Sequence, residues 1–146
     1  MPASVYDSKP PIQWRGDSHM KYLLHSLLVG AGGFTGAVAR YWLAGYIASR
    51  TGGNFPWGIL AVNVLGSFII AVLLNLLPER FGVPETVRLL VSVGFLGSFT
   101  TFSTFSYDSY GLLSGGEPGR ALLNIGLNVG LGLLAVWAGF ALTRGA

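Results

Sequence analysis

Four long stretches with almost no charged side chains constrain this chain more than any other feature. Residues 56–78, 89–107 and 121–143 contain no charged side chain, and residues 22–49 contain only a histidine and an arginine. A helix needs about 20 mostly apolar residues to cross a bilayer. One such stretch can be a buried helix of a soluble protein. Four in succession, with charges mainly at the joints, predict an all-α integral membrane protein with four transmembrane helices.

The composition agrees with this class and excludes others. Only 10% of the 146 residues are charged, whereas soluble domains carry roughly 25%. The absence of cysteine excludes disulfides, thiolate metal sites and a cysteine nucleophile. The basic residues are scattered singly along the chain, so no nucleic-acid partner is expected.

The predicted organisation is a transmembrane domain, residues 20–146, after a polar leader, residues 1–19. Helices are predicted at 22–49, 57–77, 85–110 and 119–143, joined by loops too short to hold a soluble catalytic domain. The leader has no apolar core, so it is not a cleaved signal peptide. We expect it to be disordered or a remnant of cloning, with Met20 as an alternative start of translation.

Orientation in the membrane is weakly encoded. From Met20 onward, one side of a four-helix topology carries four basic residues and the other side two, namely Lys21, Arg80, Arg88 and Arg144 against Arg50 and Arg120. The Lys and Arg content of short loops sets orientation, and this bias is small. A protein that inserts in one sense usually shows a clearer asymmetry.

Small residues recur at helical spacing in the first and last predicted helices. Gly32 and Gly36 form one such pair, and Gly126 and Gly130 form the other. Pairs of this kind let helix backbones approach closely within a bilayer. We interpret both as packing faces.

The third predicted helix contains an unusual run of hydroxyl and phenyl side chains. Five Ser or Thr residues lie between Thr100 and Ser106, interleaved with phenylalanines and preceded by Gly94 and Gly97. Ser and Thr side chains compete with the backbone for hydrogen bonds, so we expect the helix to break near its middle. The alternative is that these hydroxyls bond back to their own helix and simply pack.

The polar side chains of the apolar stretches favour an anion as the solute. Asn63, Asn124 and Asn128 are amide donors, and a phenyl ring has a positive edge. Arg40 adds positive potential within the first helix, unless it only extends to the membrane interface.

No catalytic constellation is visible, so the chain is not expected to be an enzyme. Glu79, Glu85, Asp108 and Glu117 are all expected at helix ends or in loops, which leaves no carboxylate inside a helix for proton coupling. His25, near the amino end, is expected to be a spectator.

Three ordered motifs resemble the Fluc, or CrcB, family of fluoride channels. They are the run from Gly94 to Phe105, the first-helix run from Gly32 to Tyr41, and the second-helix run from Asn63 to Phe68. The resemblance extends from about Met20 to the end. It implies a passive fluoride channel in the cell (inner) membrane, formed by an antiparallel dual-topology homodimer with two pores.

The resemblance also implies roles for particular residues. Phe102 and Phe105 would present ring edges to fluoride, to which Asn63 would donate a hydrogen bond. The polar lining would include Ser103, Thr104, Ser106, Asn124 and Asn128. The backbone carbonyls of Gly97 and Thr100 would hold a structural sodium ion at the dimer centre.

One departure and two alternatives accompany this interpretation. Relatives often carry Tyr and Ser in the fourth helix, where this chain has Asn124 and Asn128. The first alternative is a small dual-topology multidrug or cation exporter, although such proteins need a buried glutamate in the first helix, which here contains Arg40. The second is a structural or assembly subunit.

Overall fold

The computed structural model describes residues 19–80 and 84–144, which form helices and short connections, with no strand in those ranges. The helices are α1 (His19–Thr51), α2 (Trp57–Arg80), α3 (Glu85–Arg88), η1 (Leu89–Leu96), α4 (Gly97–Phe99), α5 (Phe102–Ser114) and α6 (Pro118–Arg144). The leader predicted at residues 1–19 lies outside the described residues except for His19, which begins α1.

Among the residues that the structure describes, four segments are long and apolar enough to cross a membrane, which confirms the predicted all-α fold with four spans. They are His19–Thr51, Trp57–Asn75, Glu85–Ser114 and Pro118–Thr143. The segments α3, η1, α4 and α5 together form the third span. The protein is therefore a multi-pass membrane protein.

The third span is longer than predicted, and this corrects the placement of Asp108. The expected end was Tyr110, but α5 continues to Ser114, so Asp108 lies inside a helix rather than at its end. The prediction that no carboxylate falls inside a helix is therefore wrong. The stretch after Asp108 also contains Tyr110 and Gly111, and these residues made an earlier end plausible from sequence alone.

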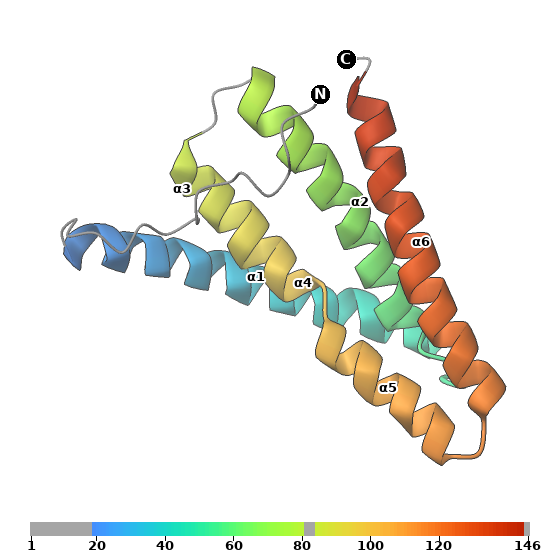
Figure 1. Ribbon diagram of the computed structural model, residues 1–146. Coiled ribbons are helices and arrows are strands. Elements are labelled where there is room, and N and C mark those ends of the chain that lie inside the picture. The colour runs from blue at the N-terminus through green and yellow to red at the C-terminus, as the bar shows by residue number, and fades with distance from the viewer. Residues whose placement is uncertain (1–18, 81–83, 145–146) are drawn as a thin grey trace.

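The helices form an open arrangement in which α2 and α6 lie side by side (Figure 1). The first half of the third span packs along α1, whereas α5 packs against α6. Tight turns join the spans at two places. Gly52 and Gly53 follow α1, and Gly116 follows α5, all with φ between 72 and 80°, a region that glycine adopts without strain.

The Gly32 and Gly36 pair packs α1 directly against the backbone of η1. A β-carbon added at Gly32 would lie 2.1 Å from the carbonyl oxygen of Leu90, and one added at Gly36 would lie 2.1 Å from that of Phe95. The packing interpretation of this pair is confirmed. At Gly126 and Gly130 an added β-carbon would meet no atom within 4 Å. That second pair therefore packs against no other described helix of the protomer, and its interpretation as a packing face stays a prediction.

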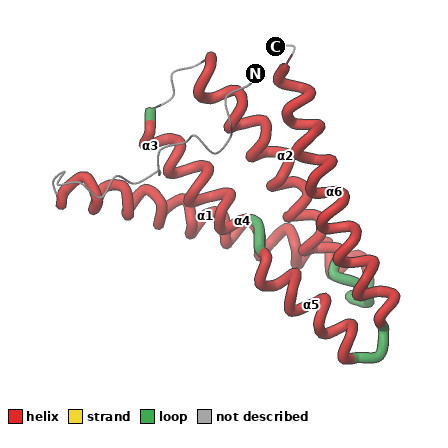
Figure 2. The backbone as a smooth tube through the Cα atoms, viewed as in Figure 1, coloured by secondary structure: helices red, strands yellow, loops and turns green. Residues whose placement is uncertain are grey.

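The segment before the break is a π-helix, which the sequence did not predict. It spans Leu89–Leu96 and is followed by only three residues of α-helix before the chain becomes extended. π-Helical turns are rare and occur frequently at functional sites. The break itself is visible as a short loop between α4 and α5 (Figure 2).

Candidate functional site

The predicted break of the third span is confirmed at Thr100 and Thr101. Thr100 has φ −82° and ψ 157°, and Thr101 has φ −151° and ψ 117°, so both residues are extended. Thr101 then begins α5 as its N-cap, because its hydroxyl oxygen accepts a hydrogen bond of 3.3 Å from the Thr104 N–H. A short polar cap thus restarts the helix within the span.

Asn63 of α2 holds the extended backbone at the break. Its amide oxygen accepts a 2.9 Å hydrogen bond from the Thr101 N–H, and its amide nitrogen donates to the Thr101 carbonyl at 3.3 Å. The Asn63 side chain therefore provides hydrogen-bond partners for both the backbone N–H and the carbonyl of Thr101, whose extended backbone lies at the break. Gly66 of α2 lets this segment approach, since a β-carbon there would lie 2.2 Å from the Thr100 methyl group.

A chain of side-chain hydrogen bonds continues from Asn63 into α6 and α5. The Asn63 amide donates to the Asn128 oxygen at 2.9 Å, and the Asn128 amide donates to the Asn124 oxygen at 3.0 Å. The Asn124 amide donates to Ser109 at 2.9 Å, and the Ser109 hydroxyl donates to the Phe105 carbonyl at 2.7 Å. Since each member both donates and accepts, the bonds polarise one another. We call this set the amide chain.

The sequence interpretation missed two residues of this region: Thr101, which bonds to Asn63, and Ser109, a member of the amide chain. Thr101 was seen only as part of the hydroxyl run, and Ser109 was not considered. The position of Ser109, four residues after Phe105, is a weak signal, because Ser in a helix often bonds to the carbonyl one turn earlier.

A groove of about 320 Å³ lies at the break, between α2, α6 and the third span. It brings together six of the predicted site residues, namely Asn63, Gly97, Thr100, Phe102, Phe105 and Asn128. We call it the break groove. The rings of Phe102 and Phe105 lie 5.5 Å apart and are tilted by 58°. Phe105 is buried, whereas Phe102 is 78% exposed in the protomer.

The other predicted site residues do not line the break groove. Asn124 is fully buried within the amide chain, Ser106 is half-buried, and Ser103 is exposed. Thr104 and Arg40 line a second groove of about 750 Å³. The sequence interpretation placed the four uncharged residues in one pathway with Asn63 and the phenylalanines and gave Arg40 a separate role as a source of positive potential. The structure places all five outside the break groove.

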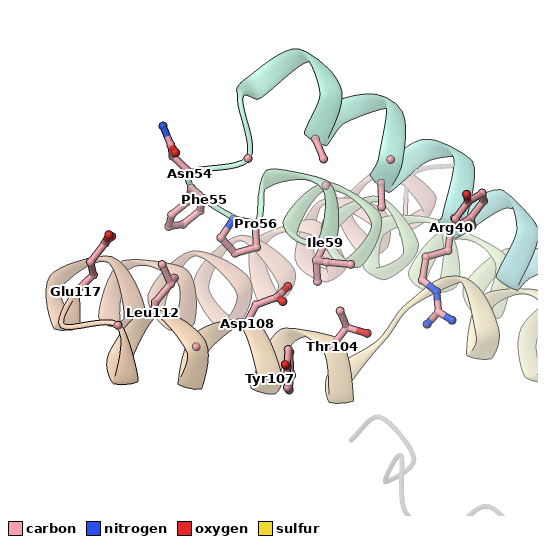
Figure 3. Close-up of a pocket in the computed structure, with 18 of the residues that line it drawn as sticks. Arg40, Asn54, Phe55, Pro56, Ile59, Thr104, Tyr107, Asp108, Leu112 and Glu117 are labelled. Atoms are coloured by element: carbon pink, nitrogen blue, oxygen red, sulfur yellow. The ribbon is translucent and has the colours of Figure 1, made fainter.

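The second groove contains charges of both signs. Arg40 extends from α1, while Thr104, Tyr107 and Asp108 lie along α5 (Figure 3). Within the described ranges, the one ion pair joins Arg120 to Glu117 at 2.6 Å, so Arg40 has no ionic partner there. Its charge therefore adds positive potential to a groove that also contains the Asp108 carboxylate.

The carbonyls of Gly97 and Thr100 lose their usual helical donors at the break. The Thr101 N–H, which would bond to Gly97 in a continuous helix, bonds to Asn63 instead. The Thr104 N–H, which would bond to Thr100, bonds to the Thr101 hydroxyl. No cluster of His, Cys, Asp or Glu suited to a metal exists among the described residues. Backbone carbonyl oxygens are therefore the ligands that this region offers to a cation, and hard cations such as sodium prefer oxygen ligands.

Together these features define a class: a small four-span membrane transport protein with an interrupted third span and a polar groove at the interruption. The family model described as CrcB-like protein, Camphor Resistance (CrcB), matches residues 27–140. The chain belongs to the CrcB family.

Several curated relatives cover most of this chain. A protein of Hydrogenovibrio crunogenus is 45% identical over 118 residues, which are 81% of this chain and 89% of the relative. One of Rhizobium meliloti is 46% identical over 120 residues, or 82% and 96% of the two chains. One of Geobacter sulfurreducens is 44% identical over 118 residues, or 81% and 95%. Each is named a fluoride-specific ion channel, FluC.

Proposed function

We propose that this protein is a passive fluoride-selective channel that lets fluoride leave the cell across the inner membrane, and not an enzyme. The observation that carries the proposal is the break groove, where two phenyl rings and two amides meet and no carboxylate is present. The CrcB family model covers the whole region that forms this groove, and the relatives that bear the name of fluoride channels cover 81% and 82% of the chain.

The chemistry of the break groove suits a small anion. Removing the water around fluoride is very unfavourable unless other groups replace it. The positive edges of Phe102 and Phe105 can replace part of that hydration. A carboxylate in the same place would repel the ion, and Asp108, the carboxylate inside α5, lines the second groove instead.

The exporter alternative receives little support from this arrangement. A proton-coupled exporter needs a carboxylate beside the transported solute. The break groove has none, and the first span, where such an exporter needs its glutamate, contains Arg40.

The working assembly we propose is an antiparallel dual-topology homodimer with two pores. Phe102 supports this idea, because it lines the break groove and yet is 78% exposed in the protomer. A second copy would cover the ring and enclose the path. The unpacked Gly126 and Gly130 pair supplies a further face where a helix of another subunit could approach.

A structural sodium ion at the dimer centre is the second part of this assembly. The Gly97 and Thr100 carbonyls without helical donors are its proposed ligands, with the same pair from a second copy completing four oxygens. The ion would tie the two broken helices together. Purification with a large organic cation in place of sodium should lower fluoride flux, and unchanged flux after exhaustive exchange would argue against the site.

Fluoride efflux from liposomes tests the proposed function. Purified protein is reconstituted into vesicles loaded with potassium fluoride, and release is followed with a fluoride electrode after valinomycin is added. We expect rapid release without a proton gradient, and little release of chloride in a parallel chloride assay. Vesicles that retain fluoride, or that release it only when a pH gradient is imposed, would contradict the proposal. Protein-free vesicles are the control.

A further inference from the structure

Ser67 of α2 has a free hydroxyl in the break groove that no role described above uses. We propose that Ser67 donates a hydrogen bond directly to fluoride in the groove, whereas Asn63 and Asn128 mainly position the walls. This inference rests on the proposed fluoride conduction. It concerns which side chain replaces water around the ion.

The side-chain N–H groups of the two asparagines that line the groove already donate hydrogen bonds within the protein. The Asn63 nitrogen donates both to the Thr101 carbonyl and to Asn128. The Asn128 nitrogen donates both to the carbonyl and to the amide oxygen of Asn124. An amide nitrogen has two hydrogens, so fluoride could use either amide only by breaking a bond that holds the break or the amide chain.

Three hydroxyl groups line the same groove, and two of them also donate hydrogen bonds within the protein. The Thr100 hydroxyl donates to the Leu96 carbonyl at 3.0 Å, and the Thr101 hydroxyl donates to Thr104 at 3.1 Å. Ser67 is the third. Its hydroxyl makes no hydrogen bond to any residue that the structure describes, and it remains half-buried rather than sealed in the core.

The position of Ser67 gives its hydroxyl access to an ion near the phenyl rings. Ser67 follows Asn63 by four residues on α2, so the two side chains share one helix face. Across from it on α6 is Gly132, where a β-carbon would lie 3.7 Å from the Ser67 oxygen. Because Gly132 has no side chain, no polar group at that position competes for the Ser67 proton.

The Ser67 hydroxyl is thus a neutral donor that can bond to fluoride without breaking a hydrogen bond within the protein. A hydrogen bond to a charged partner is stronger than one between neutral groups. Loss of one such bond corresponds to roughly a 10- to 100-fold change in an equilibrium constant. A change of that size is measurable as a change in fluoride flux or in its half-saturating concentration.

The test compares Ser67→Ala and Ser67→Thr with wild type and with Ser49→Ala, all as full chains in liposomes. Ser49 is an exposed serine near the end of α1, whose hydroxyl bonds to the Tyr46 carbonyl. We expect Ser67→Ala to lower fluoride flux at low fluoride by about 10- to 100-fold. We expect the thermal stability of Ser67→Ala to match that of wild type, since the Ser67 hydroxyl makes no hydrogen bond within the described protein. Ser67→Thr retains a hydroxyl and should recover most of the flux.

Three results would overturn the inference. The first is wild-type flux in Ser67→Ala. The second is a flux loss that parallels a loss of thermal stability. The third is an equal flux loss in the threonine variant. Failure of the proposed function is distinguishable, because wild-type protein and Ser49→Ala would then also release no fluoride.

Discussion

At the residue scale, side-chain amides take over the hydrogen bonds that the interrupted helix cannot make. Asn63 serves both polar groups of Thr101, and the bonds from Asn128 through Ser109 tie α6 to α5. A break at membrane depth is tolerated only where such partners or water replace the helical bonds. The asparagines of this chain are therefore structural as well as polar.

Replacement of Asn63 by alanine should destabilise the protein by about 1–3 kcal/mol, because the Thr101 N–H and carbonyl would lose their partner in a buried setting. The measurement is the thermal unfolding midpoint in detergent. Asn54→Ala is the matched control, since Asn54 is an exposed loop residue. Equal midpoints for the two variants would show that Asn63 does not support the break.

The phenyl rings of the break groove should control flux with little effect on the fold. Phe102→Ile keeps an apolar side chain but removes the ring edge, and Phe102 is mostly exposed in the protomer. We expect fluoride release to fall at least tenfold in Phe102→Ile and in Phe105→Ile. Phe34→Ile, at an exposed phenylalanine of α1, should release fluoride like wild type. Wild-type flux in both Phe102→Ile and Phe105→Ile would show that the ring edges do not contribute to fluoride conduction.

At the scale of elements, α1 and the first half of the third span form one close-packed unit. Backbone meets backbone at Gly32, Gly36 and Gly94, where added β-carbons would lie 2.1 to 2.7 Å from carbonyl oxygens. This contact fixes α1 against η1 just before the break. The orientation of α4 and the extended residues that follow depends on it.

A single methyl group on this contact should therefore prevent folding or assembly. Gly36→Ala would place its β-carbon 2.1 Å from the Phe95 carbonyl oxygen. We expect a large loss of monodisperse protein on a sizing column. Gly30→Ala, on the same helix, meets no atom within 4 Å and should behave like wild type. Similar yields of folded protein from the two variants would contradict the packing described here.

The sequence predicted the elements well where their signals are local. Uninterrupted apolar stretches located all four spans, and the Ser and Thr run after Gly97 located the break. The π-helix was not predictable, because its extra residue per turn leaves no periodic signature in eight residues. The positions of Asp108, Ser109 and the Gly126 pair depend on where α5 ends and what faces α6, which are properties of tertiary packing.

At the scale of the whole molecule, the protomer is open and leaves many large apolar side chains exposed. Some of these face lipid, but Phe102 lies beside a polar groove, where lipid would be a poor neighbour. The weak basic bias of the loops agrees with copies that insert in both senses. Both observations support the proposed antiparallel dimer.

Dual topology can be tested by labelling a single cysteine. The chain has no cysteine of its own, so Asn54→Cys in the exposed loop after α1 provides a unique site. A membrane-impermeant maleimide applied to intact cells should label about half of the copies. Lysed cells, in which all copies are accessible, are the control. Labelling of nearly all copies, or of almost none, would indicate one fixed orientation.

A current measurement in a planar bilayer is the sharpest test of passive, fluoride-selective conduction. Purified protein is placed between two solutions of equal pH and equal chloride that differ in fluoride. We expect a current that reverses at the fluoride equilibrium potential, and we expect this reversal potential to stay the same when a chloride gradient or a pH gradient is added. The absence of current, or a reversal potential that moves with the chloride or proton gradient, would contradict passive, fluoride-selective conduction.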